Sequence, residues 1–316
     1  MSETTKGVLA MIGACVVWGL SPLFYKLLAN VPPPEVLAHR TFWSIAFFGM
    51  VLATQGRLGE IRIALQNRRQ LLTLVVASVL ISLNWFTFIL SVQIGKATES
   101  SLGYYIFPLI AVVFGAVWFG EKLSRIQWFA IATAAFAVAS LTWGLGVAPW
   151  ISLIVSVSFA LYGVIKKGMA LGPVVSVTCE ILVLLPIWVV VLIWYHAQGQ
   201  GHFAADWSTS FLLILSGPLT AIPLIMFSYA ARRVALGTVG LLQYVNPTLQ
   251  FVCAVAVFGE PFGWWHKMAF TVIWIALALF SLSSLYQDRE ARRASRASSG
   301  VSTQVRKDAS EGSANP

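Results

Sequence analysis

The stretch Glu99–Glu121, ESSLGYYIFPLIAVVFGAVWFGE, decides the fold, because it returns 139 residues later as Thr238–Glu260, TVGLLQYVNPTLQFVCAVAVFGE. Aligned without gaps, the two copies share the pattern Tyr-x2-Pro-x10-Phe-Gly-Glu. Each copy holds about twenty residues of mostly apolar character with a proline inside, which is typical of a bent membrane helix. The repeat therefore predicts a duplicated membrane bundle, an organisation that is typical of secondary transporters.

The composition also indicates a membrane protein. Of the 316 residues, 58% are apolar and 10% are charged, far from the averages of soluble domains. The net charge of +9 would suit nucleic acid, but the basic residues lie in short loops and a tail, as membrane topology requires. Cys15, Cys179 and Cys253 all lie in apolar segments, which favours packing over disulfides or a thiolate metal site. We expect a lipid bilayer around the chain, and no nucleic acid, metal or cofactor.

The apolar stretches predict ten spans, the first of them a true span and not a removable signal, since no small-residue cleavage site follows it. The predicted spans are Gly7–Leu28, Glu35–Thr54, Leu71–Gln93, Ser100–Phe119, Ile126–Trp143, Trp150–Ile165, Val174–Tyr195, Phe211–Ala231, Thr238–Phe258 and Trp264–Tyr286. The expected fold is an all-α integral membrane protein of two five-helix repeats, over residues 1–143 and 144–286. Residues 287–316 are rich in Arg, Ser and Ala, which predicts a disordered tail.

The basic residues orient the bundle. With the N-terminus inside, 17 of the 21 lysines and arginines fall on the inner side, and only Lys26, Lys96 and Lys267 fall outside. This positive-inside bias predicts that both termini are cytoplasmic. Because each repeat has an odd number of spans, the second must enter the membrane upside down. Such inverted-topology repeats provide inward-open and outward-open states of similar energy, from which alternating access follows.

Further residues carry a resemblance to a known family. They include Trp18-Gly19-Leu20, His39-Arg40 with Trp43-Ser44, Asn84-Trp85, Glu99–Tyr104, and Gln243-Tyr244 with Pro247-Thr248. Over about residues 6–286 the chain resembles the ten-helix drug/metabolite transporter superfamily, and within it the EamA-type permeases called RarD. The resemblance implies a bundle in the bacterial inner membrane, with a central cavity that moves small organic molecules. The RarD name is tied to chloramphenicol sensitivity, while the natural substrate, the coupling ion and the choice between monomer and homodimer stay open.

Arg40 is the first candidate for a functional residue. It lies about five residues inside the second predicted span, which corresponds to about 8 Å below the outer surface. An arginine at such depth costs at least about 2.5 kcal/mol and usually faces a cavity. It could bind a carboxylate through two hydrogen bonds. The alternative is that its long side chain reaches the outer headgroups.

Two other titratable residues lie inside spans. Glu180 is six residues inside the seventh span and could carry a coupling proton, or it could be a structural acid bonded to a neighbouring helix. The repeat places it about 12 Å from Arg40 along the membrane normal, too far for a simple ion pair. His39 could titrate near neutral pH, although a lone histidine near an interface is more often only hydrogen-bonded.

Polar and aromatic side chains complete the candidate substrate site. The amides of Asn84, Gln243, Asn246 and Gln250 could line a cavity or join helices. Since the last three have helical spacing, we expect them on one face of the ninth span. Aromatic faces attract cations, and six rings could form a cage, although tryptophan and tyrosine also populate membrane interfaces. These are Trp18, Trp85, Tyr104, Tyr105, Tyr162 and Tyr244.

Prolines inside spans could act as hinges, because each frees a backbone carbonyl and bends its helix. Pro108 and Pro247 occupy equivalent positions in the two copies of the repeat. Pro218 and Pro223 make the eighth span the one that we expect to be broken.

Among rival functions, an enzyme or an ATP-driven pump lacks support, since the metalloprotease, serine-hydrolase and P-loop motifs are absent. A lipid carrier or scramblase, or a channel-like facilitator, stays an alternative.

Overall fold

The computed structural model describes residues 2–120, 123–234, 236–283 and 286. Within them, ten helices are long and apolar enough to cross a membrane, which confirms the predicted all-helical membrane fold. Glu121, the acid that ends the first copy of the repeat, and the predicted tail at 287–316 lie outside the described residues. The first eight spans are α1 (Glu3–Leu27), α2 (Pro33–Thr54), α4 (Arg68–Gln93), α5 (Ala97–Phe119), α6 (Arg125–Leu145), α7 (Trp150–Lys167), α8 (Pro173–Ala197) and α9 (Trp207–Ala231).

The ninth span, Thr238–Val257, is divided. It consists of α10 (Leu236–Gln243), α11 (Val245–Val252) and a π-helical turn at Cys253–Val257. Pro247 has no N–H with which to bond the carbonyl of Gln243, and α10 ends at that residue. Gln243 therefore ends α10, whereas Asn246 and Gln250 lie on α11, where a hydrogen bond joins them.

The expectation that the eighth span is broken is wrong. Helix α9 continues from Trp207 to Ala231 with Pro218 and Pro223 inside it. Neighbouring backbone holds it in place, because a Cβ added at Gly217 would come within 2.5 Å of the carbonyl carbon of Trp43 on α2. This close helix–helix contact outweighs the local effect of the two prolines, as neighbouring helices often do in membranes.

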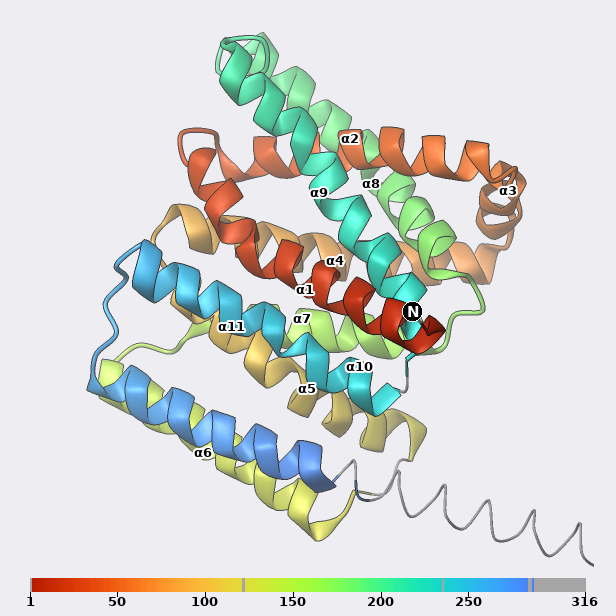
Figure 1. Cartoon of the computed structure of the whole chain (residues 1–316). Helices are drawn as coiled ribbons and strands as arrows, with labels where there is room; N and C mark the ends of the chain where they lie inside the picture. Colours follow the sequence, from red (N-terminus) through yellow and green to blue (C-terminus); the bar gives the residue numbers. More distant parts are fainter. Residues whose placement is uncertain (1, 121–122, 235, 284–285, 287–316) are drawn as a thin grey trace, which may run out of the picture.

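Three pairs of equivalent spans of the two sequence repeats lie side by side and run in opposite directions, and two of them are α2 with α8 and α6 with the last span (Figure 1). At one end of α2, Glu35 contacts His202, which follows α8. At the other end, Leu52 packs with Val175 near the start of α8. Helix α6 and the last span, Trp264–Ser283, are likewise antiparallel, since Ser124 bonds Ser283 at one end and Gly144 lies against Trp265 at the other.

The start of α5 has an unusual cap. Its N-cap residue, Lys96, makes no side-chain capping bond. Instead, Glu260 accepts hydrogen bonds of 2.7 Å from the backbone N–H groups of Ala97 and Thr98, and a third from the Thr98 hydroxyl. Helices α1, α4, α6 and α9, by contrast, are capped by their own preceding residues Ser2, Asn67, Ser124 and Asp206. A residue from the second half of the chain thus completes a helix of the first.

The segment between α2 and α4, which the sequence indicates only as a basic inner loop, contains a short helix. Helix α3 spans Leu58–Gln66, and Arg57 at its start pairs with Glu60 at 2.7 Å. That ion pair holds the pKa of Glu60 below its ordinary value. Ala64 is the buried residue of α3 and packs against α2, α4 and α8 in one cluster. The helix therefore covers the end of the bundle where α8 begins.

Candidate functional site

Arg40 is buried within the bundle, with 6% of its surface exposed. Its Nε donates a hydrogen bond of 2.7 Å to the Thr220 hydroxyl on α9. The guanidinium lies 4.1 Å from the ring centre of Trp85 on α4 and 5.7 Å from that of Tyr25 on α1. Within the described residues no carboxylate forms an ion pair with it. The side chain therefore does not extend to the surface, and aromatic faces surround a charge that lacks an ionic partner.

His39 points into a different environment from Arg40. Its ring stacks on Phe203 with a centroid distance of 4.8 Å, and Trp43, one turn along α2, contacts the same ring. Both ring nitrogens of His39 and the indole nitrogen of Trp43 are buried without a hydrogen-bond partner. The loop that carries Phe203 is held by Glu35, which binds the backbone N–H and Nδ1 of His202. This arrangement closes the Glu35 end of the bundle.

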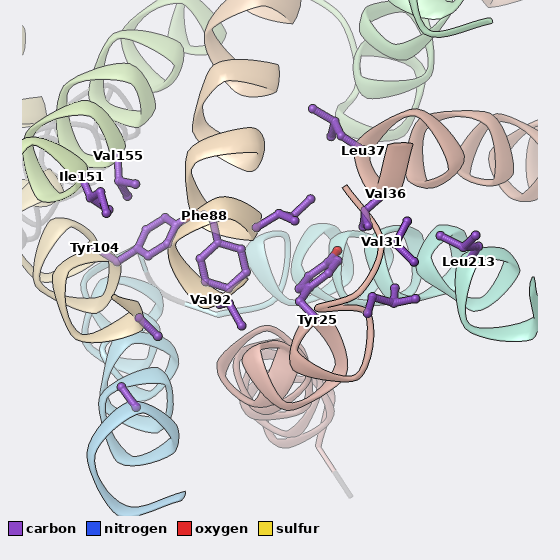
Figure 2. Packing of buried hydrophobic residues seen from close by; sticks show 14 residues of the cluster. Tyr25, Val31, Val36, Leu37, Phe88, Val92, Tyr104, Ile151, Val155 and Leu213 are labelled. Carbon is purple, nitrogen blue, oxygen red and sulfur yellow. The ribbon is translucent and has the colours of Figure 1, made fainter. Parts of the chain in front are cut away.

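An unbroken series of aromatic rings leads from the Arg40 region to Glu180. Figure 2 shows its first members, Tyr25, Phe88 and Tyr104, in a row, with centroid distances of 5.9 Å at each step. Tyr104 then contacts Phe159 on α7, and Phe159 stacks on Tyr162. The Tyr162 hydroxyl donates to Glu180 at 3.0 Å. Aromatic surface therefore connects the two candidate ionic sites.

Asn84 joins three helices at the middle of this series. It is fully buried on α4, and its Nδ2 donates to the carbonyl of Val155 and to the hydroxyl of Ser158, both on α7. Its Oδ1 accepts a hydrogen bond of 2.8 Å from the Tyr104 hydroxyl on α5. The amide holds Tyr104 in place and has hydrogen-bond partners for both its oxygen and its nitrogen. Of the two roles that the sequence left open, cavity lining and joining helices, these contacts correspond to joining helices.

Glu180 lies in a polar cluster with Lys166, Ser176 and Tyr162. The carboxylate is 1% exposed and accepts a bond of 2.6 Å from the Lys166 amino group, which also contacts Ser176. Ser176 donates to the same oxygen at 2.8 Å, and Tyr162 donates to the other. The sequence treats Lys166 as an inner-loop charge, whereas the structure places it in the last turn of α7 as the ionic partner of Glu180. The lysine and the carboxylate therefore form a buried ion pair between α7 and α8.

The two ionic sites lie at different depths. Phe48 on α2 packs in one cluster with Val177 and Ile181 on α8, so it marks the level of Glu180. Eight residues separate Arg40 from Phe48, which corresponds to about 12 Å along the helix axis. Their contacts also differ entirely, since Arg40 bonds α9 and Glu180 bonds α7.

The remaining aromatic and amide candidates lie outside the series of aromatic rings between Arg40 and Glu180. Trp18 contacts Phe227 on α9. Tyr105 bonds the Thr248 hydroxyl at 2.7 Å, and together with Tyr244 it lines a cavity of about 390 Å³ beside the last span. Asn246 accepts a bond from Gln250, whose Oε1 is buried without a partner. The candidates therefore fall into separate groups, and only Trp85, Tyr104 and Tyr162 lie near Arg40 or Glu180.

The residues of the site that were not among the sequence candidates include Tyr25, Lys166, Ser176 and Thr220. Tyr25 and Thr220 contact Arg40 from helices far along the chain, and Lys166 bonds Glu180 across the consecutive helices α7 and α8, so span counting does not reveal them. A weak signal exists for Lys166, because Tyr162 and Lys166 have the spacing of neighbours on one helix face.

Comparison with known proteins gives consistent matches. The model of the EamA-like transporter family matches residues 5–143. The chain is 41% identical over 292 residues to Protein RarD of Streptomyces exfoliatus, covering 92% of this chain and 93% of that protein. It is 38% identical over 296 residues to the uncharacterized transporter YojE of Bacillus subtilis (strain 168), covering 92% and 98%. A solved structure described only as "Crystal structure of protein" has 18% identity and a TM-score of 0.58, covering 87% of this chain and 97% of that one. At that identity the likeness shows the fold alone.

Proposed function

The chain belongs to the EamA-like transporter family as a RarD-like member, and we propose that it is a secondary transporter that exports small organic metabolites or drugs by alternating access. The observation that carries this proposal is the buried Arg40 and the buried Glu180–Lys166 pair, joined by aromatic rings inside ten spans. Intramembrane charges commonly mark substrate and ion pathways. The arrangement supports substrate handling at Arg40 and proton coupling at Glu180.

Three antiparallel pairs of equivalent spans support an inverted repeat with units at residues 1–143 and 144–286. Helix α2 packs against α8, and α6 against Trp264–Ser283. Helix α5 crosses α11, where Tyr105 bonds Thr248. Inverted repeats alternate between two states by exchanging the conformations of their halves. In the state described here, Glu35–His202 and Glu260–Thr98 close the end that the basic residues predict to be outside.

The paired prolines fit this scheme as hinges. Pro108 lies within a continuous α5, while the equivalent Pro247 lies in the first turn of α11, directly after the break. Equivalent positions thus adopt different conformations in the two halves, as alternation between two states requires. Pro218 and Pro223 lie in the continuous α9, beside the Thr220 that holds Arg40. Movement of α9 would therefore change the surroundings of Arg40.

Counterflow in liposomes tests the transporter proposal. We expect purified protein to bind a small organic compound in a ligand screen and to exchange that compound, labelled, for unlabelled compound on the opposite side. Alternating access predicts that the rate of exchange saturates as the concentration of the compound rises. It also predicts that uptake of labelled compound is faster when unlabelled compound is present on the opposite side. Flux that does not saturate would contradict it in favour of a channel-like facilitator, and transbilayer movement of labelled phospholipid alone would favour a lipid carrier or scramblase.

The orientation has its own test. We expect the loops at Lys96 and Gln200 to face outward and the loop at Gln55 to face the cytoplasm, because of the positive-inside bias. Single cysteines can be placed by Lys96→Cys, Gln200→Cys and Gln55→Cys in a background without Cys15, Cys179 and Cys253, which are buried and unpaired. A membrane-impermeant maleimide should label the first two in intact cells and the third only after lysis. Labelling of Gln55→Cys in intact cells would overturn the predicted topology.

A further inference from the structure

The charges within the described spans and at their ends differ in their partners. Glu180 and Glu35 lie inside spans, where Glu180 is paired with Lys166 and Glu35 is bound by His202, and Glu260, just after the ninth span, is bound by the start of α5. Arg40, by contrast, has hydrogen-bonding and aromatic contacts but no carboxylate in an ion pair among the described residues. The guanidinium is always charged at physiological pH, so the interior of the bundle around Arg40 carries one uncompensated positive charge. A charge at such depth is stabilised strongly by an anion.

The contacts of Arg40 also fix how it would meet an anion. Thr220 holds Nε, and the face of the guanidinium packs on Trp85. The group therefore presents its edge, the geometry that pairs with a planar carboxylate through two parallel hydrogen bonds. Lysine carries the same charge but cannot reproduce this planar arrangement.

The surface beside Arg40 is suited to a flat apolar group. Trp85, Phe159 and Tyr162 are only half-buried, so part of each ring is accessible. Tyr104 lies in the same series and is held by Asn84. Rings at such positions bind a second aromatic ring by offset or edge-to-face contact. A cation, in contrast, would meet the like charge of Arg40.

We propose that the transported substrates include aromatic organic monocarboxylates, whose carboxylate binds Arg40 while the ring packs along Trp85 toward Phe159. This assignment rests on the proposed transporter function and names its substrate class. It makes Arg40 and Trp85 specificity-determining residues, with Thr220 as a positioning residue that orients the guanidinium. The Lys166–Glu180 pair, being already neutral as a pair, does not compete for the anion.

Binding of labelled benzoate to the purified full-length protein tests this proposal. Benzamide and benzylamine have nearly the same shape and are the neutral and cationic competitors. We expect saturable benzoate binding that unlabelled benzoate displaces at least tenfold better than either competitor. Arg40→Gln should weaken benzoate binding at least tenfold, and Arg40→Lys should weaken it less. Arg57→Gln, which removes a partly exposed arginine of the α3 ion pair, is the matched control and should leave binding unchanged.

Several outcomes would overturn the assignment. These are the absence of saturable benzoate binding to the wild-type protein, equal displacement by benzylamine, or full binding to a folded Arg40→Gln variant. Because the competition uses the wild-type chain, it decides the matter even if the variants fail to fold. Trp85→Leu adds a second measurement, since it should weaken benzoate binding more than it weakens binding of acetate, which has no ring. Counterflow of a neutral or cationic compound without benzoate binding would refute the substrate class and leave the transporter function intact.

Discussion

Lys166→Ala is expected to lower the free energy of unfolding by about 3–5 kcal/mol, the largest stability effect that we foresee for a single charged residue. The reason is that Glu180 is 1% exposed and Lys166 is its ionic partner at 2.6 Å. Removing the lysine leaves the carboxylate buried beside only the hydroxyls of Ser176 and Tyr162. Chemical unfolding in detergent, followed by circular dichroism, measures the change.

A matched surface pair provides the control for this stability effect. Lys6 pairs with Glu3 at 2.8 Å, but both side chains are about half exposed or more, so Lys6→Ala should cost less than about 1 kcal/mol. The double variant Lys166→Met with Glu180→Gln should recover most of the lost stability, because no unpaired charge then stays buried. Equal losses for Lys6→Ala and Lys166→Ala would contradict the importance of the buried pair.

Glu180→Gln is expected to reduce the accumulation of substrate driven by a proton gradient at least tenfold. Exchange of substrate without a gradient should continue. Glutamine keeps the shape of the side chain but has a single acceptor oxygen, so it can accept from Ser176 or from Tyr162 but not from both as the carboxylate does, and it cannot carry a proton. In wild-type protein, a proton on Glu180 would break its ion pair with Lys166, and loss of that proton would restore it. Such a change biases one conformational state over the other, which is the requirement for coupling.

Proteoliposomes with an imposed pH gradient test the coupling role, using the compound found by the liposome screen. The control is Glu60→Gln, which removes a carboxyl group that pairs with Arg57 on the short helix α3, outside the ten spans. That variant should accumulate substrate as the wild type does. If Glu180→Gln accumulates substrate normally, Glu180 is a structural acid and the coupling group must be sought elsewhere. If it also loses exchange without a gradient, its role includes the conformational change itself.

Hydrophobic length and repetition were sufficient to predict the ten spans. The observed spans agree within a few residues at nearly every end, because about twenty apolar residues can do little else in a bilayer. The break in the ninth span and the continuity of α9 were not predictable in the same way. Both spans contain prolines, and the difference depends on packing, such as the contact of Gly217 with the backbone of Trp43.

The sequence was sufficient to identify the charged residues of the candidate site, but not the residues that they contact. Arg40 and Glu180 are identifiable because charge inside a span is costly. Their partners Thr220 and Lys166 lie far along the chain or at the end of a span, where a hydroxyl or a lysine is ordinary. Likewise, six aromatic residues suggested one cage, but three-dimensional packing separates Trp18, Tyr105 and Tyr244 from the rings near Arg40 and Glu180.

The cap that Glu260 provides for α5 has a consequence for how the chain is made. The ribosome delivers Ala97 and Thr98 to the membrane 162 residues or more before it delivers Glu260. Until then the first N–H groups of α5 lack the carboxylate that binds them in the finished protein, and Lys96 offers no substitute. The first five spans can thus insert early but complete this end of α5 only after the ninth span has emerged. The first half of the chain therefore depends on the second for the cap of α5, which gives a physical reason for keeping both in one polypeptide.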